Sequence, residues 1–168
     1  MALAAPLAIV YAGVYDVAAT RQHTPPVYWM LMTALRHSVR AHAAREAPHP
    51  PDLTSPDLAD QGLVLYHQHC AQCHGAPGRA PEPLGLGLTP PAPNLIVIGR
   101  DATPGELYWA VAKGLKMTGM PAWEFRLTDD ELWAVVAWMK AMPGLAPVEY
   151  EARRGAVTGS APDEGSTP

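Results

Sequence analysis

The chain has 168 residues, of which 48% are hydrophobic, so its length and composition suit one compact domain with extensions and argue against wholesale disorder. The net charge is −4 and only 17% of the residues are charged, whereas a nucleic-acid-binding protein normally carries a basic surplus. Two cysteines are also too few for a disulfide-rich scaffold.

Residues 1–54 are predicted to lie outside the main domain. Residues 1–15 are almost wholly apolar, but they are fewer than the roughly 20 residues that a helix needs to cross a bilayer. We interpret them as a membrane anchor or as the core of a signal peptide. Residues 27–39 place apolar side chains on one helical face, which predicts an amphipathic helix at a membrane surface or packed on the main domain. A proline-rich stretch at residues 47–52 predicts a stiff linker.

Three helices are predicted in residues 55–145, which we assign to the main domain. Their expected N-cap residues are Ser55, Thr103 and Thr128, and the last two are followed by the glutamates of capping boxes, Glu106 and Glu131. Their expected ends lie near Cys70, Gly114 and Pro143. No segment shows the alternation of polar and apolar residues that is typical of a strand, so the predicted fold class is all-α.

Two further segments are predicted to be irregular. Residues 75–94 are rich in proline and glycine, which indicates a long loop, and loops of this length are usually functional. Residues 146–168 are dominated by glycine, serine, proline and acidic residues, which favours a disordered tail.

A C-x-x-C-H motif occurs at Cys70-Ala71-Gln72-Cys73-His74, and this motif is the attachment signature of c-type haem. Two thiols at this spacing can each add to a vinyl group on one porphyrin edge, and the adjacent histidine can then bind the iron. A structural zinc site would need four ligands, and only His67 and His69 lie close enough in sequence to contribute. A redox-active dithiol normally follows a strand, and none is predicted here.

A sixth iron ligand is expected further along the chain, because His74 fills only one axial position. Met117 and Met120 lie in the predicted loop between the second and third helices, where no helical pattern accounts for them. Methionines elsewhere in the predicted helices are better explained by core packing.

The order of these features resembles a class I monohaem c-type cytochrome. The resemblance covers residues 55–145 and rests on C-x-x-C-H, the long Pro/Gly loop, Gly119-Met120-Pro121-Ala122-Trp123 and the last amphipathic helix. It implies a domain of three main helices around one covalently bound haem c, here with an N-terminal helical extension. It also implies thioether bonds at Cys70 and Cys73 and axial ligation by His74 and Met120, with Met117 as the alternative to Met120.

The resemblance carries structural implications as well. In this family a glycine and an aromatic residue of the first helix pack against an aromatic residue of the last, which here are Gly62 and Tyr66 opposite Trp138 or Trp133. A backbone carbonyl, often that of a proline, accepts a hydrogen bond from the axial histidine. The candidates for this acceptor are Pro81, Pro83, Pro90, Pro91 and Pro93. Trp123 and Arg100 are candidates for contact with the haem propionates.

The expected function is one-electron transfer in a respiratory chain, without catalysis. Because c-type haem is attached outside the bacterial cytoplasm, the protein is expected on the periplasmic side of the inner membrane, anchored or exported. Expected partners are a terminal oxidase, a dehydrogenase or another cytochrome, with no nucleic acid and no small-molecule substrate. The alternative is a haem enzyme or gas sensor with an open or labile sixth iron site.

Overall fold

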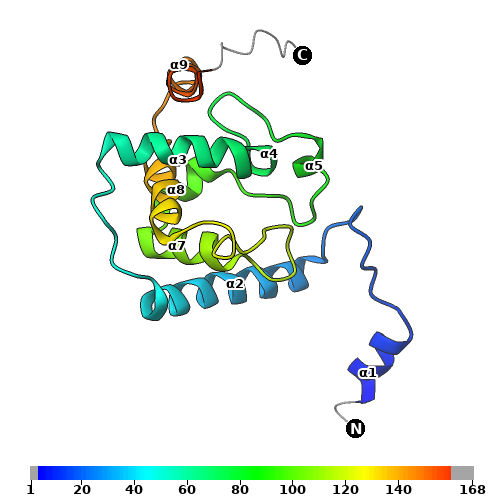
Figure 1. Ribbon diagram of the computed structural model, residues 1–168. Helices are drawn as coiled ribbons and strands as arrows, with labels where there is room; N and C mark the ends of the chain where they lie inside the picture. The colour runs from blue at the N-terminus through cyan, green and yellow to red at the C-terminus, as the bar shows by residue number, and fades with distance from the viewer. Residues whose placement is uncertain (1–3, 160–168) are drawn as a thin grey trace.

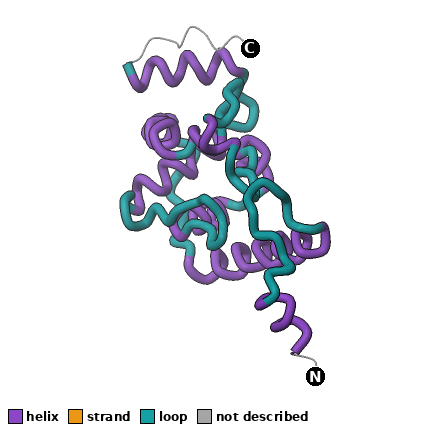
Figure 2. Tube along the Cα trace, turned by 90° about the vertical axis from the view of Figure 1, so that its right-hand side faces the viewer, coloured by secondary structure: helices purple, strands orange, loops and turns teal. Residues whose placement is uncertain are grey.

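The computed structural model describes residues 4–159, and every regular element in that range is a helix (Figures 1 and 2). The fold is therefore all-α, as predicted. In chain order the helices are α1 (Ala4–Tyr11), α2 (Pro25–Glu46), α3 (Pro56–His69), α4 (Ala71–His74), α5 (Pro83–Leu86), α6 (Leu95–Asp101), α7 (Pro104–Lys113), α8 (Asp129–Ala141) and α9 (Pro147–Thr158).

The three predicted main helices are α3, α7 and α8, and each begins at its predicted cap. The Ser55 hydroxyl accepts from the backbone N–H of Leu58 at 3.4 Å. Thr103 and Thr128 form complete capping boxes with the glutamates three residues later. Because these bonds satisfy N–H groups that a helix leaves unpaired, they fix where each helix begins.

The core of the domain lies where α3 crosses α8 (Figure 1). Gly62 permits this close crossing, because a Cβ at that position would overlap the carbonyl oxygen of Ala134 and lie 2.9 Å from the Cβ of Trp138. Trp138 is thus the aromatic residue opposite Gly62. Trp133 instead stacks on Tyr108 of α7, with ring centroids 4.5 Å apart.

The N-terminal extension is helical. The C-terminal half of α2 packs on α7, where His42 stacks on Trp109 at 5.3 Å between ring centroids and the Trp109 indole N–H donates to Glu46 at 2.8 Å. The helix α1 projects away from the domain (Figure 1), and Val10 and Tyr11 on it are exposed. Among the helices of residues 4–159, none combines the length and the apolar character that a membrane crossing requires.

The prediction of a disordered tail is wrong for residues 147–158, which form α9. This helix is held because Tyr150 is fully buried and because Arg153 donates to Asp60 of α3 at 2.6 Å and lies 5.5 Å above the Trp138 ring. The rest of the predicted tail, residues 160–168, lies outside the described residues. The short helices α5 and α6 were not predicted either, and α5 interrupts the irregular loop expected at residues 75–94.

Candidate functional site

The C-x-x-C-H motif forms a separate turn at the end of α3. Cys70 ends α3, and α4 then carries Cys73 and His74. Gly75 ends this turn with a φ of 67°, a conformation that glycine adopts without strain. Burial, reinforced by the charge of a Cys73 thiolate, raises the pKa of a free Cys70 thiol to about 12.

His74 is fixed by the long loop. Its Nδ1 lies 2.8 Å from the carbonyl oxygen of Pro93, and because a carbonyl can only accept, Nδ1 must carry the proton. This tautomer leaves the lone pair on Nε2. Burial, partly offset by the bond to Pro93, lowers the pKa of His74, which favours the neutral imidazole that metal ligation requires. Of the five candidate prolines, Pro93 is the one whose carbonyl meets the histidine.

Tyr66 of α3 also stabilises the turn. Its buried hydroxyl donates to the carbonyl oxygen of Gly75 at 2.7 Å, which ties α3 to the first residue after the motif. A cavity of about 200 Å³ adjoins this region and is lined in part by Tyr66, His74, Arg79 and Asn94.

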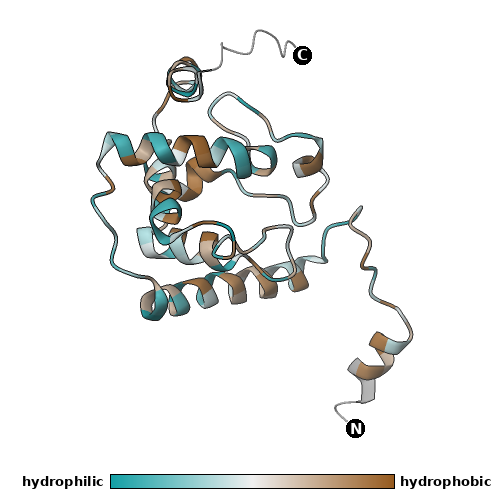
Figure 3. Ribbon diagram, viewed as in Figure 1, coloured by the Kyte–Doolittle hydropathy of each residue, from teal (hydrophilic) through white to brown (hydrophobic). Residues whose placement is uncertain are grey.

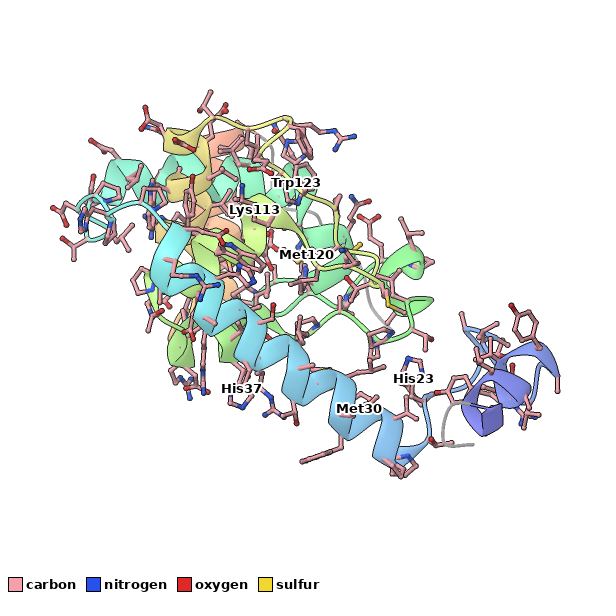
Figure 4. The ribbon with its side chains drawn as sticks, turned by 90° about the horizontal axis from the view of Figure 1, so that it is seen from below. His23, Met30, His37, Lys113, Met120 and Trp123 are labelled. Atoms are coloured by element: carbon pink, nitrogen blue, oxygen red, sulfur yellow. The ribbon has the colours of Figure 1, made fainter. Side chains whose placement is uncertain are left out.

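The two methionines of the loop between α7 and α8 differ in environment. Met120 is half-buried and packs against the hydrophobic core, whereas Met117 is 85% exposed. The Met120 N–H donates to the Thr118 hydroxyl at 3.1 Å, and the Met120 carbonyl accepts from Leu115 at 3.2 Å. In Figure 4, Met120 lies on this loop, whereas Met30 lies on α2. The loop therefore turns Met120, and not Met117, toward the interior.

The other site candidates from the sequence have ordinary surroundings. His69 packs on Trp123 with ring centroids 4.8 Å apart, so Trp123 has a protein partner in this structure. Arg100 is exposed near the end of α6. Within the described part of the chain, no group of three or more His, Cys, Asp or Glu side chains could hold a metal ion, so nothing there supports a zinc site.

Sequence reasoning missed the contribution of α9. Arg79, in the loop after His74, forms an ion pair with Glu151, which also accepts from Arg154 at 3.0 Å. Pro147 packs on Gly78 of the same loop, where a Cβ would lie 2.6 Å from the proline Cβ. A signal for the start of α9 was present, because Pro147 is followed by Glu149, whose carboxylate caps the N–H of Ala146 at 2.7 Å.

The chemistry of these side chains fits a covalently attached haem. The chain offers two thiols on one turn, a neutral histidine with its Nδ1 occupied, and a half-buried thioether on another loop. The helical fold and this set of groups define a c-type cytochrome.

Comparison with known proteins supports the same class. Residues 57–139 match the family described as cytochrome c oxidase, cbb3-type, subunit III. Over 125 residues the chain is 30% identical to the cbb3-type cytochrome c oxidase subunit FixP of Rhizobium meliloti (strain 1021). That alignment covers 71% of this chain and 39% of the relative, so the match spans well under half of the relative's length. The protein is a c-type cytochrome, and its cofactor is covalently attached haem c.

Proposed function

We propose that the protein is a one-electron carrier in which Cys70 and Cys73 form the thioether bonds and His74 and Met120 are the axial ligands. The observation that carries this proposal is the bond between His74 Nδ1 and Pro93, which orients the imidazole as a ligand with Nε2 available. When bound, the haem supplies a single iron centre that gains and loses one electron.

The surrounding residues favour electron transfer over catalysis. The Pro93 carbonyl fixes the tautomer of His74 and increases its basicity as a ligand. A thioether at Met120 favours ferrous iron and raises the reduction potential. With both axial positions filled by protein, neither dioxygen nor a small substrate has an open site, which separates a carrier from a haem enzyme or gas sensor.

The proposal extends to location and partners. FixP is named as a subunit of a cbb3-type oxidase, which favours a terminal oxidase as the acceptor over a dehydrogenase or another cytochrome. The apolar α1, with exposed Val10 and Tyr11, supports membrane association. The periplasmic side is proposed because c-type haem is attached outside the bacterial cytoplasm. The acidic net charge supports neither nucleic acid nor a membrane of anionic lipid as the primary partner.

The test is the optical spectrum of the purified haem protein, ferric and ferrous, with and without carbon monoxide. We expect a low-spin spectrum with the weak red ferric band of sulfur ligation and no change with carbon monoxide. Met120→Ala should abolish that band and allow the gas to bind. Met117→Ala is the matched control, since its exposed side chain should leave the spectrum unchanged. A wild-type haem that is high-spin or binds carbon monoxide readily would contradict the proposal and favour the enzyme or sensor.

A further inference from the structure

The helix α2 of the N-terminal extension packs along one face of α7 (Figure 1). Glu106, Trp109 and Lys113 recur at helical spacing on α7, so their side chains lie on the same face. Arg40 of α2 lies 3.3 Å from the Glu106 carboxylate, and the Trp109 indole N–H donates to Glu46 of α2 at 2.8 Å. Figure 3 shows hydrophilic and hydrophobic turns mixed along α2, as expected of a helix that binds a neighbour on one side only.

These contacts fix the position of α7 at its start and in its middle. At the start, one Glu106 oxygen caps the N–H of Thr103 at 2.8 Å while the other faces Arg40. In the middle, the ring of Trp109 stacks on His42 with centroids 5.3 Å apart. The helix α7 has ten residues, which is too few for a stable helix in isolation. Its position therefore depends on the helices that pack against it, which include α2.

The loop that carries Met120 begins and ends on the last turn of α7. The backbone N–H groups of Trp123 and Glu124 donate to carbonyl oxygens of that turn at 3.3 and 3.1 Å. The loop leaves the same turn at Gly114, where a Cβ would lie 2.6 Å from the backbone nitrogen of Ala122. Because both ends of the loop rest on this turn, a displacement of the turn displaces Met120.

Lys113 connects the two sets of contacts. Its ammonium group forms an ion pair with Glu124, at the end of the methionine loop. The hydrogen bond to Glu124 and, to a smaller degree, the charge of Glu46 raise the pKa of Lys113 above its ordinary value. Lys113 thus interacts with a carboxylate of the loop and with one of α2, which couples α2 to the loop electrostatically.

We propose that α2, through the bond between Glu46 and Trp109, positions the loop that carries Met120. Glu46 and Trp109 are positioning residues, because they act on the ligand through α7. The proposal rests on the axial ligation by Met120 proposed above. Since α2 lies outside residues 57–139, the part of the chain that matches the family, this role belongs to the N-terminal extension.

The test is a titration of the full-length ferric haem protein with imidazole, followed by loss of the weak red band of sulfur ligation. Imidazole replaces the thioether only in molecules whose methionine loop has opened, so its affinity reports the ease of opening. Trp109→Phe keeps an aromatic ring against His42 but removes the N–H that Glu46 accepts. We expect the affinity for imidazole to rise about fivefold, which corresponds to the loss of one hydrogen bond.

A second variant shows whether this bond is the cause. Glu46→Ala removes the acceptor, and it should raise the affinity for imidazole at least as much as Trp109→Phe does. Because both variants remove the same bond, the double variant should bind imidazole no more tightly than Glu46→Ala alone. Effects that multiply in the double variant would overturn the proposed role of the bond.

Asp60→Asn is the matched control. It weakens an ion pair of the same kind between two other helices, because Asp60 of α3 accepts from Arg153 of α9 at 2.6 Å. Its affinity for imidazole should stay within about twofold of the wild type, since the pair lies outside α2, α7 and the methionine loop. An equal rise in Asp60→Asn and Trp109→Phe would show a general loss of stability and overturn the positioning role.

Hydrogen exchange gives a readout without added ligand. The Leu115 N–H donates to the Met120 carbonyl at 3.2 Å, so its exchange rate in the haem protein reports opening of the loop. This rate should rise about fivefold in Trp109→Phe. The rate of the Gly75 N–H, which donates to Ala71 in the haem-attachment turn, should not change. An unchanged Leu115 rate would contradict the coupling of α2 to the loop.

The two proposals fail in different ways. A wild-type ferric protein without the red band refutes ligation by Met120, and the positioning role is refuted with it. A wild-type protein that shows the band, with variants at Glu46 and Trp109 that bind imidazole as the wild type does, leaves the ligation standing and refutes the positioning role alone.

Discussion

The two loops that carry the proposed axial ligands are held in different ways. The loop after His74 is tied to three other segments, of which α9 is the furthest away in the sequence. Tyr66 of α3 donates to Gly75, and Arg79 pairs with Glu151 of α9 across 72 positions of the chain. His74 itself reaches across to Pro93, so three separate segments hold this side of the site.

The hydrogen bonds and the ion pair of the methionine loop join it mainly to neighbouring residues in the sequence. Its backbone bonds join Leu115 to Met120 within the loop, and Trp123 and Glu124 to Val111 and Ala112 at the end of α7. The Lys113–Glu124 ion pair is also local. A segment held by local contacts can open without the rest of the fold, whereas one held by distant contacts opens only when those elements separate. The comparison therefore predicts that the loop carrying Met120 unfolds locally before the loop that follows His74.

The largest effect is expected at the crossing of α3 and α8, which forms the core beneath both ligand loops. Gly62→Ala should place a methyl group against the carbonyl of Ala134 and push α3 away from α8, at a cost of about 3 kcal/mol or more in the free energy of unfolding. Urea unfolding followed by far-UV circular dichroism measures this cost. Gly87→Ala is the matched control, because a Cβ there would lie 3.6 Å from its nearest neighbour and should cost less than about 1 kcal/mol. Equal losses in the two variants would mean that the close crossing is not what stabilises the domain.

A second prediction sharpens the comparison at α9. Tyr150→Ala should remove about 3 kcal/mol, because it leaves a cavity beneath α9, next to Trp138. With α9 loosened, hydrogen exchange should accelerate at residues 75–82, while residues 114–127 should keep the rates of the wild type. Tyr150→Phe is the control. The buried Tyr150 hydroxyl has no hydrogen-bond partner in the described structure, so losing it should change stability by less than about 0.5 kcal/mol. Faster exchange in both loops would show that α9 does not act selectively on the histidine side.

What the sequence revealed, and what it left hidden, follows the same division between local and distant contacts. The starts of α3, α7 and α8 were predictable because a cap residue and its partner lie within one helical turn. The C-x-x-C-H motif is equally local. Haem attachment could be inferred from five consecutive residues alone.

Distant contacts were not predictable in this way. Five prolines could have accepted from His74, and only the path of the long loop selects Pro93. The residues of α9 form a helix because Tyr150 packs at a buried site beside Trp138. No property of residues 147–158 alone reveals that site.

A smaller effect is expected from loosening the methionine loop alone. Thr118→Val should remove the bonds from its hydroxyl to Leu115 and from the Met120 N–H, at a cost of about 1 kcal/mol. In the haem protein, the red ferric band of sulfur ligation should then disappear at a lower urea concentration, with little change in the midpoint seen by circular dichroism. Met117→Ala should alter neither midpoint. If the band and the helices are lost together in Thr118→Val, the loop does not open on its own.

The smallest predicted effect concerns pH and the anchor of the histidine side. Burial opposes ionisation of Glu151, but hydrogen bonds and charges from Arg79 and Arg154 outweigh it and hold the pKa below its ordinary value of 4.5. A carboxylate with a depressed pKa stabilises the folded state above that ordinary value, and the contribution is lost as the pH falls through the depressed pKa. Because the pair is partly exposed, we expect a contribution of about 0.5 kcal/mol to the free energy of unfolding.

The measurement for Glu151 is the free energy of unfolding between pH 6 and pH 3, compared for the wild type and Glu151→Gln. The variant should be less stable near pH 6 and should lose less stability on acidification, since it has no charge to neutralise. Asp101→Asn, which removes an exposed carboxylate on α6, should follow the wild-type slope. Equal slopes for Glu151→Gln and the wild type would mean that the arginine pairs add nothing to the anchor. The greater resistance of the His74 loop to local unfolding, relative to the Met120 loop, would then depend on Tyr66, Pro93 and the packing of Tyr150.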